Sequence, residues 1–183
     1  MRKTAAEAAA APLGVENFMA EGQWERDRSR YVPARHALPH LSKREKTYFV
    51  TFCTDGRMIL PPKARDIVLA CCIHDHGSRH WLHCAVVMPD HVHLLTSPYE
   101  EASLVEVMSR LKGASAHRVN DALRRNGSLW QREYFDRIVR SDESLAQKAE
   151  YISNNPVRAG LVEVATDWPW FWSGAAAASA AES

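Results

Sequence analysis

Apolar and polar positions alternate along the chain with two different periods, which predict strands in some stretches and helices in others. Strands are predicted at residues 47–54, 81–88, 91–97 and 133–140, where aromatic and β-branched residues gather or alternate with polar ones. Helices are predicted at residues 61–77, after the capping box of Ser103 and Glu106, and from Ser141 to about Asn154. The order β-α-β-β-α-β is that of the ferredoxin-like arrangement, an α+β fold. We therefore expect an antiparallel sheet with helices on one face, an opposite face free to hold a site, and a C-terminal helix that carries Tyr151.

The two ends of the chain show neither period. Residues 1–40 join an alanine-rich start to a basic stretch and predict a largely disordered basic arm. Residues 173–183 are rich in alanine and predict a disordered tail. Residues 41–172, between them, are enough for one domain with its own core.

The composition of the 183-residue chain, with 46% hydrophobic and 25% charged residues, is that of an ordinary globular protein. No apolar run approaches the ~20 residues that a membrane span needs, and the N-terminus lacks the apolar segment of a signal peptide. The four cysteines have no CxxC spacing and indicate reduced core residues. These features predict a cytoplasmic protein without a membrane partner.

Charge is spread unevenly, although the formal net charge is only +1. Residues 24–48 contain seven Lys and Arg against three Asp and Glu, and residues 102–140 contain eight against four. Each of the two segments therefore carries a net charge of +4. Such segments are compatible with a nucleic-acid-binding face and equally with a solvated charged surface.

The stretch "VVMPDHVHLL", residues 86–95, places two histidines inside an apolar run. On a strand, alternate residues share a face, so His91 and His93 lie together and Val92 lies opposite. The two imidazoles are then roughly 7 Å apart by strand rise, which suits two ligands of one metal ion. Two hydrogen-bonded structural histidines are the alternative.

The last predicted helix carries a polar stripe, on which Tyr151 and Asn155 lie one turn apart. The carbonyl oxygen of Asn155 suits a hard divalent cation, while imidazole suits Mn²⁺ better than Mg²⁺. A half-buried tyrosine at the edge of a core is the alternative for Tyr151. Residues 71–84 also hold three cysteines and four histidines, but no standard zinc spacing fits them.

Four motifs together make the chain resemble the single-tyrosine HUH transposases, and most closely the REP-associated tyrosine transposases. They are "YFVTFCTDGR", "VVMPDHVHLL", "LWQREYFDRIVR" and "EYISNNPVRAGLV", and the resemblance covers about residues 38–172. It implies that Tyr151 is the nucleophile and that His91, His93 and Asn155 hold a divalent ion, Mg²⁺ or Mn²⁺. Other insertion-sequence relatives carry Gln at the position of Asn155.

The resemblance also implies cleavage and rejoining of single-stranded DNA through a 5′-phosphotyrosine bond, at repeat elements that fold into hairpins. The protein would act as a monomer or homodimer in a bacterial cytoplasm, associated with the nucleoid. Bases of single strands stack on aromatic rings, and phosphates bind cations. The expected DNA-binding residues are Arg132, Arg137, Arg140, Lys148, Trp130, Tyr134 and, in the arm, Arg35.

Two other functions stay open from the sequence. One is a catalytically inactive module that binds single-stranded or hairpin nucleic acid on the same fold. The other is a metal-dependent hydrolase in which Tyr151 is structural. A stable protein–DNA adduct separates the three, because only the transposase reaction forms one.

Overall fold

Five strands form one sheet in the computed structural model, which describes residues 46–140 and 145–174. The strands are β1 (Tyr48–Cys53), β2 (His80–Val87), β3 (His91–Pro98), β4 (Phe135–Ile138) and β5 (Phe171–Ser173). They lie in the order β4-β1-β3-β2-β5, and each neighbouring pair is antiparallel. The expected arm, most of the expected tail, Arg35 and the expected Ser141 cap fall outside the described residues.

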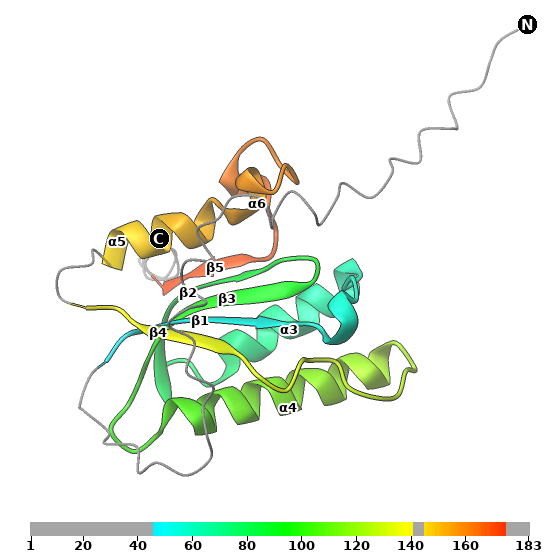
Figure 1. Ribbon diagram of the computed structural model, residues 1–183, viewed down its shortest axis with the longest axis horizontal. Helices are drawn as coiled ribbons and strands as arrows, with labels where there is room; N and C mark the ends of the chain where they lie inside the picture. The colour runs from blue at the N-terminus through cyan, green and yellow to red at the C-terminus, as the bar shows by residue number, and fades with distance from the viewer. Residues whose placement is uncertain (1–45, 141–144, 175–183) are drawn as a thin grey trace, which may run out of the picture. The chain divides into compact units, whose positions relative to one another are not determined.

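Helices cover both faces of this sheet (Figure 1). On one side lie α3 (Pro62–His74) and α4 (Leu104–Ala122), and on the other lie α5 (Leu145–Ser153) and the short α6 (Asn155–Arg158). Two 3₁₀ turns, η1 (Asp55–Arg57) and η2 (Ala165–Asp167), complete the described elements. None of these helices is both long and apolar enough to cross a bilayer.

The register of β1 and β3 assigns their side chains to the two faces. Val50 pairs with Leu94, and both belong to the core under α3 and α4. Thr51 pairs with His93 and therefore faces the other way, as do alternate residues along both strands. The predicted alternation of β3 is thus confirmed: Val92 is in the α3–α4 core, while Leu95 packs on the α5 side.

The α5 side of the sheet has a second hydrophobic cluster of its own. Its buried members are Cys84, Val86, Met88, Leu95, Ile152 and Trp168. The prediction that this face is free was therefore wrong, because Ile152 brings α5 down onto the sheet. The physical cause lies in β2, which is apolar on both of its faces and must be covered on both.

The strand and helix order β-α-β-β-α-β is confirmed over residues 48–138, and the helix at 104–122 begins with the predicted capping box. The Ser103 hydroxyl accepts from the Glu106 backbone N–H at 3.2 Å, and the Glu106 carboxylate accepts from the Ser103 N–H at 2.8 Å. The strand β5 was not predicted. It is only three residues long and pairs with β2 on one side, too short for a period to be seen.

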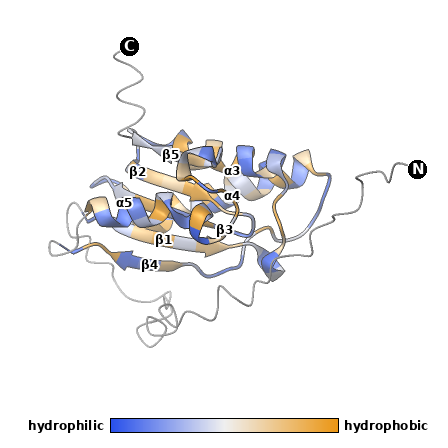
Figure 2. Cartoon of the chain, turned by 90° about the horizontal axis from the view of Figure 1, so that it is seen from above, coloured by the Kyte–Doolittle hydropathy of each residue, from blue (hydrophilic) through white to orange (hydrophobic). Residues whose placement is uncertain are grey.

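The edge strand β4 differs from the central strands in polarity. Figure 2 shows hydrophilic residues on β4, whereas β2 is apolar along most of its length. Among the described strands β4 pairs with β1 alone, and its Asp136 and Arg137 place charges on the outer edge of the sheet. Short, charged edge strands resist pairing with other chains, so the open edge is chemically protected.

Candidate active site

His91 and His93 lie on the α5 face of the sheet, on adjacent same-face positions of β3. Their ring centroids are 4.8 Å apart at an interplanar angle of 79°. The shared face predicted from their spacing is confirmed. The residues are only 6% and 5% exposed, however, because α5 and α6 cover the face that had been expected to be open.

Each imidazole is held through its Nδ1 atom. Nδ1 of His91 is 2.6 Å from Oδ1 of Asp90, and Nδ1 of His93 is 2.7 Å from the hydroxyl of Thr51. Both Nε2 atoms are buried, and Nε2 of His93 has no hydrogen-bond partner within ordinary geometry. Metal-binding histidines have this arrangement, one nitrogen anchored by the protein and the other directed to the metal.

The electrostatic environment keeps the second imidazole neutral. Burial, and after it the neighbouring His91, lowers the pKa of His93 well below its usual range. A neutral ring retains the lone pair that a metal ion needs. Of the described residues, no group of three or more His, Cys, Asp and Glu is placed to hold a metal, so a third ligand from this part of the chain would be another residue type.

Asn155 supplies a candidate for that third ligand. It is the first residue of α6, is 2% exposed, and donates from Nδ2 to the Tyr151 carbonyl at 3.1 Å. Its side chain also acts on His93 in the direction that raises the pKa, as an acceptor oxygen turned towards the ring would. The residue predicted to share the ion with the histidines therefore lies beside them, although it begins a new helix instead of continuing the tyrosine helix.

Tyr151 approaches the same place from α5. Its ring centroid is 6.3 Å from the His93 ring and 6.1 Å from the Phe49 ring, and the Arg158 guanidinium lies 5.0 Å from it. The ring is half-buried, with Ile152 beside it in the core. A hollow of about 430 Å³ opens next to the ring, lined by Gln147, Glu150, Tyr151, Asn154, Val157 and Arg158.

Two of the predicted DNA-binding cations belong to the rim of this site. Arg137 lies opposite Phe49 across the β1–β4 pair, and the Lys148 ammonium is 5.8 Å from the Phe49 ring. Phe49 itself stacks on His93 with centroids 5.5 Å apart. Arg132 and Arg140 are exposed, and no contact described here connects them with Tyr151.

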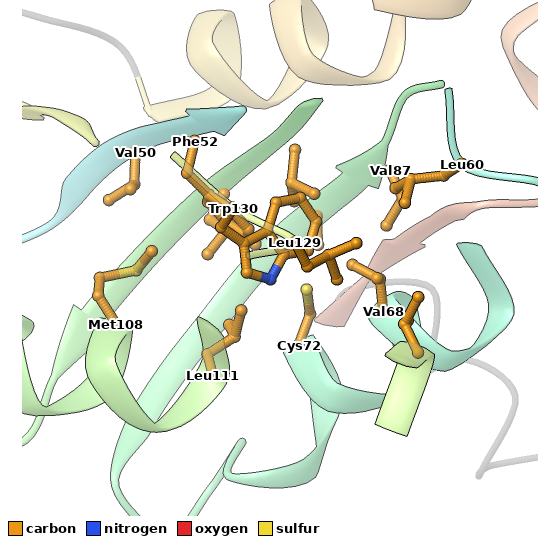
Figure 3. Packing of buried hydrophobic residues seen from close by; sticks show 14 of the residues in the cluster. Val50, Phe52, Leu60, Val68, Cys72, Val87, Met108, Leu111, Leu129 and Trp130 are labelled. Atoms are coloured by element: carbon orange, nitrogen blue, oxygen red, sulfur yellow. The ribbon is translucent and has the colours of Figure 1, made fainter. Parts of the chain in front are cut away.

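Trp130 does not belong to a DNA-binding surface, which corrects the prediction from sequence. It is 5% exposed, its ring meets Phe52 edge-on at 4.7 Å, and its Nε1 donates to the Ser115 hydroxyl at 3.0 Å (Figure 3). A ring enclosed by the α3–α4 core cannot stack on a base. Trp130 lies in the connecting segment before the strand predicted at residues 133–140, where no period assigns a side chain to the inside or the outside.

Replacing Trp130 should therefore change stability and not DNA recognition. We expect Trp130→Ala to lower the free energy of unfolding by about 3–5 kcal/mol, the usual cost of emptying a buried aromatic site. Trp130→Phe keeps most of the packing and should cost less. Urea unfolding measures both, and a variant with normal stability but weakened DNA binding would contradict the core assignment.

Tyr134 is separated from the site in a different way. It packs against the α3–α4 core, on the face opposite Tyr151, and Lys112 lies 5.5 Å from its ring. Burial, with the nearby Asp136 and other acidic groups, raises the pKa of Tyr134 to about 12. Tyr134 is therefore not a second candidate nucleophile within this site.

The cysteine- and histidine-rich stretch at residues 71–84 serves packing and hydrogen bonding. Cys72 is fully buried in the core, and burial raises the pKa of its thiol, which leaves it protonated. Nδ1 of His80 is 2.5 Å from the Thr96 hydroxyl, and Nε2 of His83 is 2.9 Å from the Ser97 hydroxyl. These side chains are directed to separate partners.

Four residues of the site were missed by sequence reasoning. Phe49 and Thr51 are alternate residues of β1 and lie on the same face of the sheet as His93. The alternation could be seen in the sequence, but it did not indicate a function for either residue. Asp90 was treated only as a turn residue, and Arg158 only as part of a motif. Their roles depend on contacts between elements, which a local pattern does not report.

Comparison with known proteins adds three findings. A family model described as "Transposase IS200 like" matches residues 67–155, a range that includes His91, His93, Tyr151 and Asn155. A protein of Haemophilus influenzae (strain Rd) named as a REP-associated tyrosine transposase is 32% identical over 94 residues, covering 46% of this chain and 53% of the relative. The chain thus spans about half the length of that curated relative.

The third finding is a solved structure of a REP-associated tyrosine transposase bound to a REP hairpin. It is 19% identical, has a TM-score of 0.59, and covers 75% of this chain and 82% of that one. At this level of identity the similarity establishes the α+β fold with its antiparallel sheet.

Proposed function

We propose that the chain acts as an IS200-like transposase, cleaving and rejoining single-stranded DNA through a covalent bond to Tyr151. The match of residues 67–155 to the family model described as "Transposase IS200 like" supports this proposal. The observation that carries the proposal is the approach of Tyr151 to a buried pair of imidazoles. The Tyr151 ring is 6.3 Å from the His93 ring and lines a hollow that is open to solvent, so the nucleophile is both near the candidate metal site and accessible. A covalent adduct that depends on Tyr151 tests it.

The residues present fit a divalent metal ion, Mg²⁺ or Mn²⁺. Nε2 of His91 and His93 and the side-chain oxygen of Asn155 would hold it, two nitrogens and one oxygen from three buried residues. This ligand set suits Mn²⁺ somewhat better than Mg²⁺, because imidazole is a softer ligand than carboxylate or water. When bound, the ion polarises a non-bridging phosphate oxygen and stabilises negative charge on the leaving 3′ oxygen.

Tyr151 supplies the nucleophile. Its phenolic oxygen attacks the scissile phosphorus in line, so that one P–O bond forms to tyrosine and the bond to the 3′ oxygen breaks. The phenol gives up its proton and the departing oxygen gains one, leaving a 3′-OH end and a 5′-phosphotyrosine. Attack by a 3′-OH reverses the step. Each direction exchanges one phosphate ester bond for another, so rejoining needs no ATP.

Three cations near Tyr151 or its neighbour Phe49 are the proposed contacts for the phosphates of the strand. Arg158 and Lys148 come from the tyrosine side of the site, and Arg137 from β4. Arginine binds phosphate oxygens in bidentate fashion, whereas lysine acts as a point charge. We assign Arg158 to the scissile region, because its guanidinium lies 5.0 Å from the Tyr151 ring, and the other two to the neighbouring phosphates.

The DNA ligand we propose is a hairpin-forming repeat with a single-stranded flank. The related protein of known structure is described as bound to a REP hairpin. In this chain the reacting tyrosine is half-buried beside Arg158, so an unpaired strand reaches it more readily than a stiff duplex. The exposed Arg132 and Arg140 extend the basic surface and are proposed contacts outside the cleavage site.

DNA affinity should fall steeply with salt. If Arg137, Lys148 and Arg158 each neutralise one phosphate, the slope of log K against log salt is about −2, since each contact on a single strand contributes about −0.7. Arg137→Ala should make the slope shallower by about 0.7. Fluorescence anisotropy of a labelled hairpin across a salt series measures this.

The matched control is Lys63→Ala, because Lys63 is an exposed cation on α3, on the other side of the sheet. It should leave the slope unchanged. A flat salt response of the wild type, or equal affinity for a blunt duplex and for the hairpin with its single-stranded flank, would contradict the proposed mode of binding.

A further inference from the structure

The turn after β1 has a backbone conformation that most residues avoid. Gly56 and Arg57 both have φ of 57°, in the left-handed region. Glycine adopts it without cost, whereas a side chain such as that of Arg57 is uncommon there. Such a residue persists when its surroundings hold it, and it is a reason to ask what its side chain does.

This turn holds the tip of the β2–β3 hairpin at Asp90. The Thr54 N–H and hydroxyl both donate to the Asp90 carbonyl, at 2.8 and 3.0 Å. The Leu60 N–H donates to the Pro89 carbonyl at 2.7 Å. Arg57 completes the contact by donating to Oδ2 of Asp90 at 3.1 Å. Arg57 therefore holds the carboxylate oxygen of Asp90 that does not contact His91.

The other carboxylate oxygen engages His91. Oδ1 of Asp90 is 2.6 Å from Nδ1 of His91, and the two side chains are 14% and 8% exposed. An ionised carboxylate can only accept hydrogen bonds, so this contact requires the proton on Nδ1. In a neutral ring the lone pair then lies on Nε2, the buried nitrogen that faces the candidate metal site.

Arg57 places a positive charge beside that carboxylate, with Nη1 3.1 Å from Oδ2 of Asp90. The corresponding contact of His93 has no such directionality. The Thr51 hydroxyl can donate or accept, so it does not by itself determine which nitrogen of His93 carries the proton.

We propose that Asp90, held by Arg57, is a positioning residue that fixes His91 as the Nδ1–H tautomer and thereby sets the affinity of the site for a divalent metal ion. Asp90 is not a ligand in this arrangement, because Oδ1 is engaged by Nδ1 of His91 and Oδ2 by Arg57. The metal part rests on the proposed function. The tautomer part concerns the protein without metal or DNA.

The test begins with the tautomer. In protein with ¹⁵N-labelled histidine, two-bond ¹H–¹⁵N correlation spectra distinguish Nδ1–H from Nε2–H rings without added metal. Wild-type His91 should be the Nδ1–H form. Asp90→Asn keeps the size of the side chain, but its one amide oxygen cannot accept from both Arg57 and His91 as the two carboxylate oxygens do. This variant should shift His91 towards the Nε2–H form. Arg57→Gln should give a smaller shift in the same direction.

Mn²⁺ affinity is the second readout, measured by electron paramagnetic resonance or calorimetry on the DNA-free protein. We expect Asp90→Asn to weaken binding about 10- to 100-fold, the usual effect of losing a histidine-orienting carboxylate. The control is Asp55→Asn, because Asp55 is exposed in the same turn and makes no contact with His91 in the hydrogen bonds described. It removes the same charge and should change affinity little.

An Nε2–H ring in wild-type His91 would overturn the proposal, and so would equal Mn²⁺ affinities of Asp90→Asn and wild type. An equal loss in Asp55→Asn and Asp90→Asn would also overturn it, since charge alone would then explain the effect. A wild-type protein that takes up no Mn²⁺ would contradict the proposed function instead, and the tautomer signals would still decide the role of Asp90.

Discussion

Tyr151→Phe is expected to abolish covalent attachment to DNA completely while leaving the protein folded and able to bind its hairpin. The substitution removes the single oxygen that attacks phosphorus and keeps the ring between Phe49, His93 and Arg158. The free energy of unfolding should change by no more than about 0.5 kcal/mol. The measurement is a denaturing gel after incubation with Mn²⁺ and a hairpin that carries a single-stranded flank.

The label must lie on the DNA 3′ of the cut, because the proposed bond joins tyrosine to the 5′ phosphate. Tyr134→Phe is the matched control, since Tyr134 packs on the opposite face and should retain full adduct formation. If Tyr151→Phe still formed the adduct and Tyr134→Phe did not, Tyr134 and not Tyr151 would be the nucleophile. If the wild type forms no adduct on any hairpin, the binding module without cleavage becomes the better description.

The second large effect is expected at the histidine pair. Replacing His91 or His93 by Ala should reduce cleavage below detection and weaken Mn²⁺ binding by more than the roughly 10- to 100-fold typical of an orienting residue. DNA affinity should stay close to that of the wild type, because phosphate contacts with the rim cations carry most of it. Removing divalent ions with a chelator should reproduce the loss of cleavage, and Mn²⁺ should restore it in the wild type only.

Both histidines are buried, so His91→Gln and His93→Gln should be measured beside the alanine variants, because Gln fills more of the space that Ala leaves empty. His83→Ala is the control, since His83 bonds to Ser97 away from the pair and should retain Mn²⁺ binding. Cleavage by His93→Ala at the wild-type rate would remove the metal site from the mechanism. A loss of hairpin binding equal to the loss of cleavage would indicate a role in holding DNA instead.

Much of the fold could be predicted from local patterns. Strand and helix order, the face shared by His91 and His93, and the capping box at Ser103 all depend on residues close in sequence, and each is confirmed. The strand β5 could not be predicted, because three residues contain no readable period. It forms where β2 offers a free edge, and that edge exists only in the folded sheet.

Burial was harder to predict than secondary structure. Phe49 stands in a predicted strand and Trp130 in a connecting segment, and neither pattern showed that Trp130 is enclosed by the α3–α4 core while Phe49 faces His93. The run "CAVVM" in and after β2 does contain a signal, since a strand apolar on both faces must be covered on both. This signal predicts that a further element covers the face of the sheet that carries His91 and His93.

The sequence by itself determined which chemical groups are present and which of them share a face of one element. Strand period two brings His91 and His93 together, and helix period three to four puts Tyr151 and Asn155 one turn apart. Only the tertiary structure decided which groups from different elements meet: Tyr151 with His93, Asn155 with the same ring, and Arg57 with Asp90. The reason is physical. Periodicity follows from the local geometry of one backbone segment, whereas contacts between segments follow from the burial of apolar side chains on both sides of the sheet, which depends on every element at once.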